Sequence, residues 1–288
     1  MLRPRRSMLY VPASNLRALE KARGLRCDGI IFDLEDAVLP QEKAAARLAL
    51  RDAYKAGGYE GRELLIRINR HNTPWTMDDR KLVAELNPDG VVLPKVESAA
   101  EIVAAERTLY NDGISAHTRM WAMIETPKGV LHTEEIAQAS PRLAGFIMGT
   151  NDLAREMQVE LTPERTALLF ALSRCVLAAR SNNLAVLDGV YGNIRDELGF
   201  MTACVQGKML GFDGKTLIHP SHIEGANRAF APQPESVRQA EKIIAAWKTE
   251  EHKGVIVVDG QMIEELHVKA AEQLLVVRDA IVTREGMI

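Results

Sequence analysis

The sequence predicts a closed (β/α)8 barrel, a TIM barrel, followed by a C-terminal helical lid extension. Eight short apolar runs, each bounded by turn residues, alternate with segments of helical period. Most of these runs are continuously apolar, as expected for parallel strands that helices cover. The length of 288 residues lies within the range that such barrels fill as one domain. An open, doubly wound sheet is the alternative fold.

The strands are expected in order along the first three quarters of the chain. Their ranges are 8–12, 28–36, 63–69, 89–97, 119–126, 143–150, 184–190 and 215–220. The helical segments between them include 41–56, 98–109, 163–181 and 197–210. Pro163 follows Thr162, a capping residue type, so it is expected in the first turn of its helix.

The remaining residues are not needed to close a barrel. We therefore expect a catalytic barrel domain over 1–231 and a C-terminal extension over 232–288. The extension contains a helical segment at 235–248, the short apolar run GVIVVDG, and a last helical segment from Met262 to about Val282. It could be a packed extension, an oligomer contact or a lid.

Composition excludes several classes of protein. The 36 basic and 39 acidic residues give a net charge of −3, which provides no reason to expect a nucleic-acid or membrane-surface partner. The three cysteines are far apart and form no CxxC pair, so neither a disulfide framework nor a zinc cluster is indicated. With no long apolar segment and no leader pattern, we expect a cytoplasmic protein that does not enter a membrane.

Polar residues gather where the expected strands end. In barrel enzymes the active site is built at these carboxyl ends. Carboxylates that directly follow an apolar strand, as in GIIFDLEDAV and RMWAMIETP, are expected to be partly buried and therefore need a cation, a metal or strong donors. The polar residues at the expected strand ends are Glu35, Asp36, Arg67, Asn69, Lys95, Glu125, Asn151, Asp152, Asp188 and His219.

Glu125 and Asp152 are the candidate metal ligands. They are 27 residues apart (152 − 125) and end the fifth and sixth strands. Because neighbouring strands lie about 4.8 Å apart, the two carboxylates could share one cation. Two carboxylates plus waters, with positions open to substrate oxygens, are typical of Mg²⁺. The structural alternative pairs each acid with a nearby lysine or arginine.

Glu35, Asp36 and Arg67 are the candidate catalytic residues of the early strands. Strand alternation places Asp33 and Glu35 on one face and Asp36 on the other. We interpret Glu35 or Asp36 as an acid that holds metal-bound water, while Asp36 could equally cap the next helix. Arg67 lies within an apolar strand, so it needs a counter-charge or an anionic ligand such as a developing oxyanion.

Seven motifs, taken together and in this order, resemble those of the citrate lyase β-subunit-like proteins of the HpcH/HpaI aldolase family. They are RSMLYVP, GIIFDLEDAV, RIN, LPKVES, IETPKGV, GTND and GFDGKTLIHP, and they cover nearly the whole chain. The resemblance implies a (β/α)8 barrel, commonly trimeric, that binds Mg²⁺ and makes or breaks a carbon-carbon bond in a 3-hydroxyacyl thioester.

The resemblance also implies roles for individual residues. Glu125 and Asp152 look like the metal ligands, and Arg67 looks like the residue that faces the thioester carbonyl. The run VDGQMIE resembles the lid of the CoA-dependent lyases, which in relatives reaches over a neighbouring subunit's site. Those enzymes usually end this motif in Asp, whereas this chain has Glu264, whose extra methylene moves the carboxylate by about 1 Å.

Coenzyme A is expected near the first strand and helix. Arg17 and Lys21 are the candidate groups for its nucleotide end, beyond Tyr10 and Pro12, although a solvated basic helix face also explains the two cations.

The leading hypothesis is a homotrimeric, Mg²⁺-dependent lyase that cleaves citramalyl-CoA, malyl-CoA or citryl-CoA to a 2-oxo acid and an acyl-CoA. The alternatives are the β subunit of a multi-protein citrate lyase, a class II pyruvate aldolase and a non-catalytic acyl-CoA binder.

Overall fold

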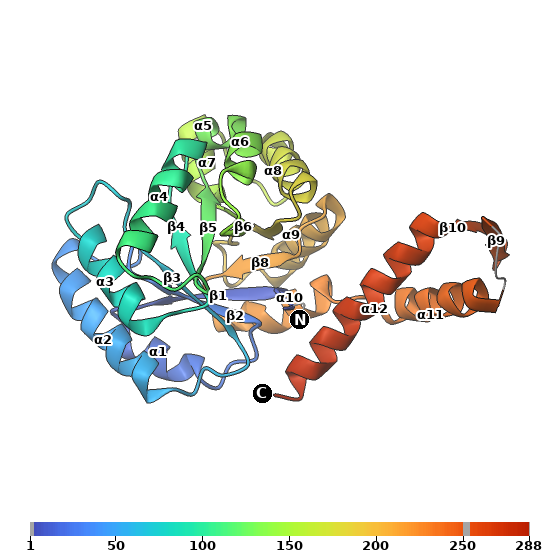
Figure 1. The fold of residues 1–288 in the computed structure, drawn as a ribbon, viewed down its shortest axis with the longest axis horizontal. Coiled ribbons are helices and arrows are strands. Elements are labelled where there is room, and N and C mark those ends of the chain that lie inside the picture. Colours follow the sequence, from blue (N-terminus) through green and yellow to red (C-terminus); the bar gives the residue numbers. More distant parts are fainter. Residues whose placement is uncertain (1–2, 250–253, 288) are drawn as a thin grey trace. The chain divides into compact units, whose positions relative to one another are not determined.

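The computed structural model describes residues 3–249 and 254–287. Eight parallel strands close into a barrel in the order β1-β2-β3-β4-β5-β6-β7-β8, with β1 paired to β8. The helices that follow the strands surround this barrel (Figure 1). The predicted (β/α)8 fold is therefore confirmed, and the open doubly wound sheet is excluded.

The bounds of the barrel elements are as follows. The strands are β1 Ser7–Pro12, β2 Gly29–Asp33, β3 Glu63–Arg67, β4 Gly90–Leu93, β5 Arg119–Ile124, β6 Leu143–Met148, β7 Ala185–Asp188 and β8 Gly214–Leu217. The α-helices are α1 Leu16–Ala22, α2 Lys43–Ala56, α3 Thr76–Leu86, α4 Ala99–Asn111, α5 Pro127–Leu131, α6 Thr133–Gln138, α7 Thr150–Met157, α8 Leu169–Ser181, α9 Glu197–Leu210 and α10 Ile223–Phe230. Three short 3-10 turns are η1 Pro40–Glu42, η2 Thr166–Leu168 and η3 Pro220–His222.

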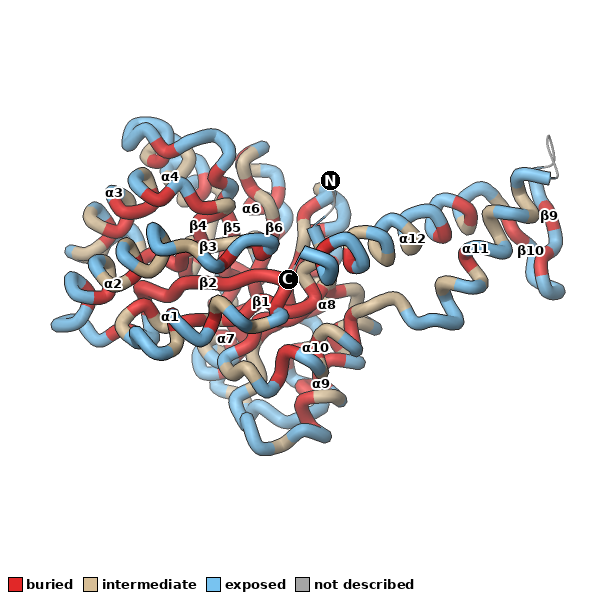
Figure 2. Tube along the Cα trace, turned by 90° about the horizontal axis from the view of Figure 1, so that it is seen from below, coloured by how far each residue is buried: buried red, intermediate tan, exposed pale blue. Residues whose placement is uncertain are grey.

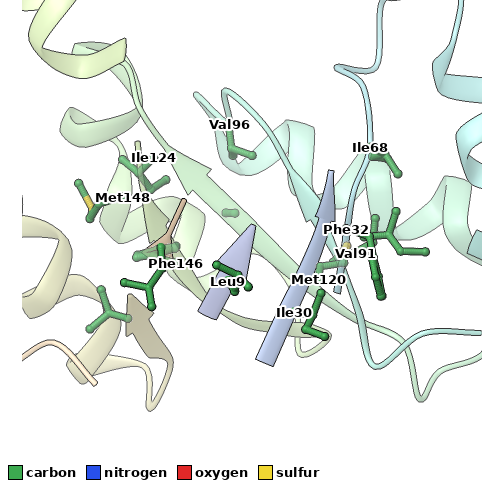
Figure 3. Close-up of a cluster of buried hydrophobic side chains, with 14 of the residues drawn as sticks. Leu9, Ile30, Phe32, Ile68, Val91, Val96, Met120, Ile124, Phe146 and Met148 are labelled. Carbon is green, nitrogen blue, oxygen red and sulfur yellow. The ribbon is translucent and has the colours of Figure 1, made fainter. Parts of the chain in front are cut away.

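Alternate residues of each strand pack on opposite sides of the barrel wall. An inner cluster contains Met8, Ile31, Leu65, Val92, Trp121, Met123, Ile147 and Leu187. Large rings fit inside because small residues face them: a Cβ at Gly145 would lie 2.7 Å from Cζ3 of Trp121. The outer faces of the strands pack against the helices, and Figure 3 shows Leu9, Ile30, Phe32 and Phe146 in this larger cluster.

Burial follows this arrangement. In Figure 2 the barrel strands are mostly buried, whereas the helices alternate between buried and exposed positions. The continuous apolar runs in the sequence therefore mark strands that are covered on both faces, as parallel barrel strands are.

Most strands end earlier than the sequence predicts. β2 ends at Asp33 and not at residue 36, and β4 ends at Leu93 and not at residue 97. The residues beyond these ends leave the ladder and form the loops at the carboxyl face of the barrel. The apolar residues that directly follow these strand ends are buried, and in the sequence they cannot be distinguished from the end of the strand.

The helix predicted from residue 163 begins later. α8 starts at Leu169, behind the turn η2, so Pro163 is not in its first turn. Arg165 adopts a left-handed backbone conformation with φ of 51° and sends its side chain to a buried acid described below. This conformation interrupts the helical run.

The chain divides into two compact units. The barrel unit spans Arg5–Phe230, and the C-terminal unit comprises the described residues of Ala231–Ile288 and of Met1–Pro4. The C-terminal unit contains α11 Pro234–Thr249, β9 Val255–Val258, β10 Gln261–Glu264 and α12 Glu265–Glu285. Within the described residues, no helix has the length and apolar character needed to cross a membrane.

The predicted start of the last helix at Met262 is wrong. Gln261–Glu264 pairs antiparallel with Val255–Val258, and Asp259 and Gly260 form the connecting turn with φ of 49° and 79°. An Asp-Gly pair with two positive φ angles is the favoured two-residue hairpin turn. The helix starts only at Glu265, directly after this hairpin.

Candidate active site

A cavity of about 380 Å³ opens at the carboxyl ends of the barrel strands. Its walls come from the ends of six strands and the loops that follow them, which is where barrel enzymes build their sites. The lining residues are Tyr10, Pro12, Asp33, Asp36, Ala37, Arg67, Met123, Met148, Gly149, Thr150, Asn151, Asp152, Val190, Thr216 and Ile218.

Arg67 finds its counter-charge on the neighbouring strand. Asp33 of β2 pairs in register with Arg67 of β3. Arg67 Nε donates to Asp33 Oδ1 at 2.8 Å and Nη2 donates to Oδ2 at 2.5 Å, and both residues are buried. Such a two-bond pair fixes the plane of the guanidinium. Arg67 is therefore an ion-paired residue that also lines the cavity.

The sequence analysis did not identify Asp33 as a site residue. Its carboxylate also accepts hydrogen bonds from the backbone N–H of Glu35 at 2.8 Å and of Ala37 at 3.2 Å. It thus shapes the loop after β2 as well as holding Arg67. The available signal was that Asp33 and Arg67 each end an apolar strand and that the two strands are consecutive.

Glu35 and Asp36 both approach the remaining nitrogen of Arg67. Arg67 Nη1 lies 3.1 Å from Glu35 Oε2 and 3.7 Å from Asp36 Oδ2. The prediction that these two acids point to opposite faces is wrong, because β2 has already ended and strand alternation no longer applies. The Arg67 guanidinium also lies over the ring of Tyr10, 5.0 Å from its centroid.

The crowding of acids around one guanidinium changes the titration of Glu35. The pKa of Glu35 is raised to about 7, chiefly by burial and in part by the nearby Asp36 and Asp33, while Arg67 opposes the shift. A carboxyl group with a pKa near neutrality can both accept and donate a proton at pH 7. This property suits an acid or base in a cavity.

Glu125 is fully buried at the end of β5. Its Oε1 accepts a hydrogen bond from the backbone N–H of Lys95 at 2.8 Å, whereas Oε2 has no hydrogen-bond partner among the described residues. Burial raises the pKa of Glu125 to about 8, and the charge of Asp152 adds to this shift. An unsatisfied buried carboxylate oxygen needs a cation, so this residue fits a metal ligand.

Asp152 lies in the first turn of α7 and lines the same cavity. Its side chain is 17% exposed and forms an ion pair with Arg155, three residues later on the helix. The structure brings the two predicted ligands together through Gly149, which precedes α7 and packs against the Glu125 carboxylate. A shared cation held by these two acids, with water and substrate oxygens as further ligands, stays a prediction.

A complete protein cage for a metal is not present. Within residues 3–249 and 254–287, no group of three or more His, Cys, Asp or Glu side chains could hold an ion.

The predicted coenzyme A residues separate into two groups. Tyr10 and Pro12 lie in the cavity wall. Arg17 and Lys21 are exposed one turn apart on α1 and do not line the cavity. Their position agrees with the solvated basic face and leaves a role in binding a nucleotide as a prediction.

Glu264 belongs to the C-terminal unit, where it precedes the first residue of α12. Its backbone N–H donates to His267 Nδ1 at 3.0 Å, in a capping box at the start of this helix. A role for its carboxylate as acid or base stays a prediction.

Asp188, at the end of β7, forms a buried ion cluster with two cations, and none of the three residues lines the cavity. Asp188 of β7 accepts hydrogen bonds from Lys215 Nζ at 2.8 Å and from Arg165 Nη1 at 2.6 Å, and all three side chains are buried. Arg165 also donates to Gln206 of α9 at 2.8 Å. The cluster ties the loop before α8 to the outer side of the barrel.

Replacing Asp188 with Asn should destabilise the barrel. Burial favours the neutral acid, but Lys215 and Arg165 prevail and lower the pKa of Asp188 below its ordinary value. The ionised group therefore stabilises the fold above about pH 4, and this contribution is lost as the pH falls further. We expect Asp188→Asn to lower the free energy of unfolding at pH 7 by about 3–5 kcal/mol, because two buried cations lose their partner.

Urea unfolding at pH 7 and at pH 3 measures this effect. The difference between wild type and Asp188→Asn should shrink at the acidic pH, and Asp78→Asn on the surface of α3 serves as the control. A difference that does not change with pH would contradict this role for Asp188.

Comparisons with known proteins agree with this geometry. The sequence profile described as HpcH/HpaI aldolase/citrate lyase matches residues 6–220. A relative from Cereibacter sphaeroides strain KD131, named (3S)-malyl-CoA thioesterase, is 45% identical over 280 residues, which cover 96% of each chain. The citrate lyase subunit beta of Escherichia coli K12 is 34% identical over 269 residues, which cover 91% of this chain and 89% of the relative.

A solved structure supports the same relationship. CitE from Mycobacterium tuberculosis, in complex with magnesium, acetoacetate and coenzyme A, has a TM-score of 0.77 and 29% sequence identity, covering 94% of this chain and 97% of that chain. The barrel, its cavity and these matches lead to one conclusion: the chain belongs to the HpcH/HpaI aldolase/citrate lyase family.

Proposed function

We propose that the chain is a Mg²⁺-dependent carbon-carbon lyase that cleaves a 3-hydroxyacyl-CoA of the citramalyl, malyl or citryl type to a 2-oxo acid and an acyl-CoA. The observation that carries this proposal is the buried Glu125 carboxylate, one oxygen of which has no hydrogen-bond partner among the described residues. It lies against Gly149, which lines the cavity together with Asp152 and Arg67.

Relatives support the ligands. The structure of the M. tuberculosis protein contains magnesium, acetoacetate and coenzyme A, and another from the same organism contains magnesium and pyruvate at 26% identity. A small oxo acid beside a divalent cation fits a cavity of about 380 Å³ that Asp152 lines, together with Gly149, next to which Glu125 lies.

In this reaction the 3-hydroxyl loses its proton and the bond between C2 and C3 breaks. The carbinol carbon becomes the carbonyl of the 2-oxo acid, and the electron pair passes to the thioester enolate. Glu125 and Asp152 would hold Mg²⁺, which supplies Lewis-acid polarisation of the substrate's hydroxyl and carboxylate oxygens.

The other residues act on the thioester half. Arg67 donates hydrogen bonds from the cavity wall to the thioester oxygen, where negative charge develops. Asp33 fixes the guanidinium plane through its two hydrogen bonds. The resemblance of VDGQMIE to a lid that in relatives reaches over a neighbouring subunit's site suggests that Glu264 of a neighbouring subunit would deliver a proton to the enolate carbon or remove one in the reverse direction.

A second candidate function is hydrolysis of the thioester. It is favoured by the relative named (3S)-malyl-CoA thioesterase, which is 45% identical over 96% of both chains. The same cavity could serve it, because Arg67 can stabilise the oxyanion that forms when water attacks the thioester carbon. The bond that breaks is then carbon-sulfur, and the hydroxy acid is released intact.

One assay separates these functions. The purified chain is incubated with Mg²⁺ and (3S)-malyl-CoA, citramalyl-CoA or citryl-CoA, and both the 2-oxo acid and the free thiol of CoA are measured. A lyase produces glyoxylate, pyruvate or oxaloacetate without free thiol, whereas a thioesterase produces free thiol without an oxo acid. Absence of both products with every substrate would contradict both proposals and, with retained CoA binding, favour a non-catalytic binder.

Two further arms test the remaining alternatives. A class II pyruvate aldolase would release pyruvate from a free hydroxy-oxo acid, and a β subunit would become active only when its lyase partners are added. The cytoplasmic homotrimer stays a prediction; light scattering should give three times the chain mass of 31.9 kDa.

Gly149 provides a test of the metal site. A Cβ at this position would lie 2.3 Å from Cβ and 2.5 Å from Oε2 of Glu125, so Gly149→Ala must displace that carboxylate. We expect turnover to fall by about 100-fold, with weaker Mg²⁺ binding measured by calorimetry. Gly192→Ala is the matched control, because nothing lies within 4 Å of its added Cβ. Unchanged Mg²⁺ affinity in Gly149→Ala would contradict the assignment of Glu125.

A further inference from the structure

The loop between β2 and α2 carries two of the acids that lie next to Arg67, and one lysine donates hydrogen bonds to its backbone. Lys43 is the first residue of α2, and it is buried. Its Nζ donates to the backbone carbonyl oxygens of Leu34 and Glu35, both at 2.8 Å. These two carbonyls lie directly beyond the end of β2, where the strand ladder no longer orders the backbone.

The hydrogen-bond partners of Lys43 are neutral, although the charges of Glu35, Asp33, Asp79 and Asp36 also act on its ammonium. Its ammonium lies 5.0 Å from the centroid of the Trp75 ring, a position typical of a cation–π contact. Among the ion pairs of the described residues, none involves Lys43. A buried lysine that only filled space would be costly, so we expect its charge to be retained for the two carbonyls.

A second set of contacts holds the same loop from the side of β3. Asn69 Nδ2 donates to the Leu34 carbonyl at 2.9 Å and to Asp79 Oδ2 at 2.6 Å. Asp79 is fully buried and also accepts a hydrogen bond from Arg47 Nη1 at 2.9 Å. Leu34 is therefore fixed from two directions, whereas the carbonyl of Glu35 depends on Lys43 and on the N–H of Val38.

We propose that Lys43 is a positioning residue for the active site: by holding the Leu34 and Glu35 carbonyls, its ammonium keeps the carboxylates of Glu35 and Asp36 against Arg67. The proposal rests on the proposed function, because it assigns Lys43 to the thioester half of the same cavity. Lys43 does not line the cavity itself, so it acts through the loop and not on the substrate.

The test compares Lys43→Met with Lys43→Arg and with a control. Methionine keeps the length and apolar stem of the side chain but cannot donate to a carbonyl, whereas arginine retains charge and donors. Lys55→Met is the matched control, since Lys55 lies on the same helix, is 60% exposed and pairs with Glu85.

Hydrogen exchange followed by mass spectrometry, with no substrate present, measures the loop directly. We expect Lys43→Met to speed exchange in peptides covering residues 34–42 and to leave the rest of the barrel unchanged. We also expect kcat with the active thioester to fall by about 10- to 100-fold, because the acids at Arg67 lose their fixed position, while KM changes by less than about threefold. Lys43→Arg should restore most of kcat.

Each outcome decides between the proposals. Unchanged exchange in residues 34–42, or unchanged kcat in Lys43→Met, overturns the positioning role. Faster exchange throughout the barrel with a lower unfolding temperature shows a general structural role and overturns it as well. A wild-type chain that turns over no thioester overturns the proposed function alone, and the exchange experiment then still decides whether Lys43 holds the loop.

Discussion

Replacing Glu125 with Gln is expected to lower Mg²⁺-dependent turnover by at least about 10³-fold, which corresponds to about 4 kcal/mol of transition-state stabilisation. The substitution keeps the size of the side chain and removes its charge. Glu125 is fully buried with one unsatisfied oxygen, and burial raises its pKa to about 8, so its ionised form has no evident use in the fold except to bind a cation. Asp152→Asn should have a similar effect, because it removes the second proposed carboxylate ligand.

Mg²⁺ titration by calorimetry, together with the product assay, tests this expectation. Glu156→Gln is the matched control, because Glu156 is exposed on α7 close to Asp152 in sequence. Without Mg²⁺, the unfolding temperature of Glu125→Gln should be close to that of the wild type below about pH 7 and should exceed it above about pH 8, where the wild-type group has to ionise in a buried position. Full activity of either variant after Mg²⁺ has been chelated would refute the metal site.

Arg67→Lys is expected to lower kcat by about 10²- to 10³-fold, the usual effect of removing one donor to a developing oxyanion. Lysine keeps the positive charge but cannot reproduce the fork that bonds both oxygens of Asp33 and still presents a nitrogen to the cavity. Coenzyme A affinity should change little, because the thioester oxygen is only one of many contacts of that large ligand. Turnover and CoA binding are measured on the same preparation.

A neutral substitution of Arg67 would leave the buried Asp33 without its partner, and the resulting loss of activity could then be due to misfolding. The double variant Asp33→Asn, Arg67→Met removes both charges and should fold, since a buried ion pair can be replaced by neutral residues of similar size without loss of stability. Arg51→Lys on α2, where the arginine is partly exposed and paired with Glu85, is the control. Arg67→Lys with wild-type kcat would remove Arg67 from the mechanism.

The architecture and part of the site could be predicted from local sequence alone. A strand covered on both sides must be apolar along its length, and the eight runs of that kind located all eight barrel strands. The same logic identified Glu125 and Arg67, because a charged residue at the end of such a run has to be buried or used. The position of Arg67 in an apolar strand also predicted that it needs a counter-charge, but the sequence did not identify Asp33 as that residue.

Contacts between segments that are distant along the chain required the tertiary structure. The pairing of Arg67 with Asp33 depends on the register of two strands, and the hold of Lys43 on the Leu34 and Glu35 carbonyls depends on how α2 docks under the loop. Nor does the sequence reveal that Gly149 packs against Glu125 or that Arg17 and Lys21 stay on an exposed helix face. The spacing of apolar residues in the sequence indicates which residues are buried. Which side chain a buried charge contacts depends on the register of the strands, the path of the loops and the docking of the helices, and many distant residues determine these together.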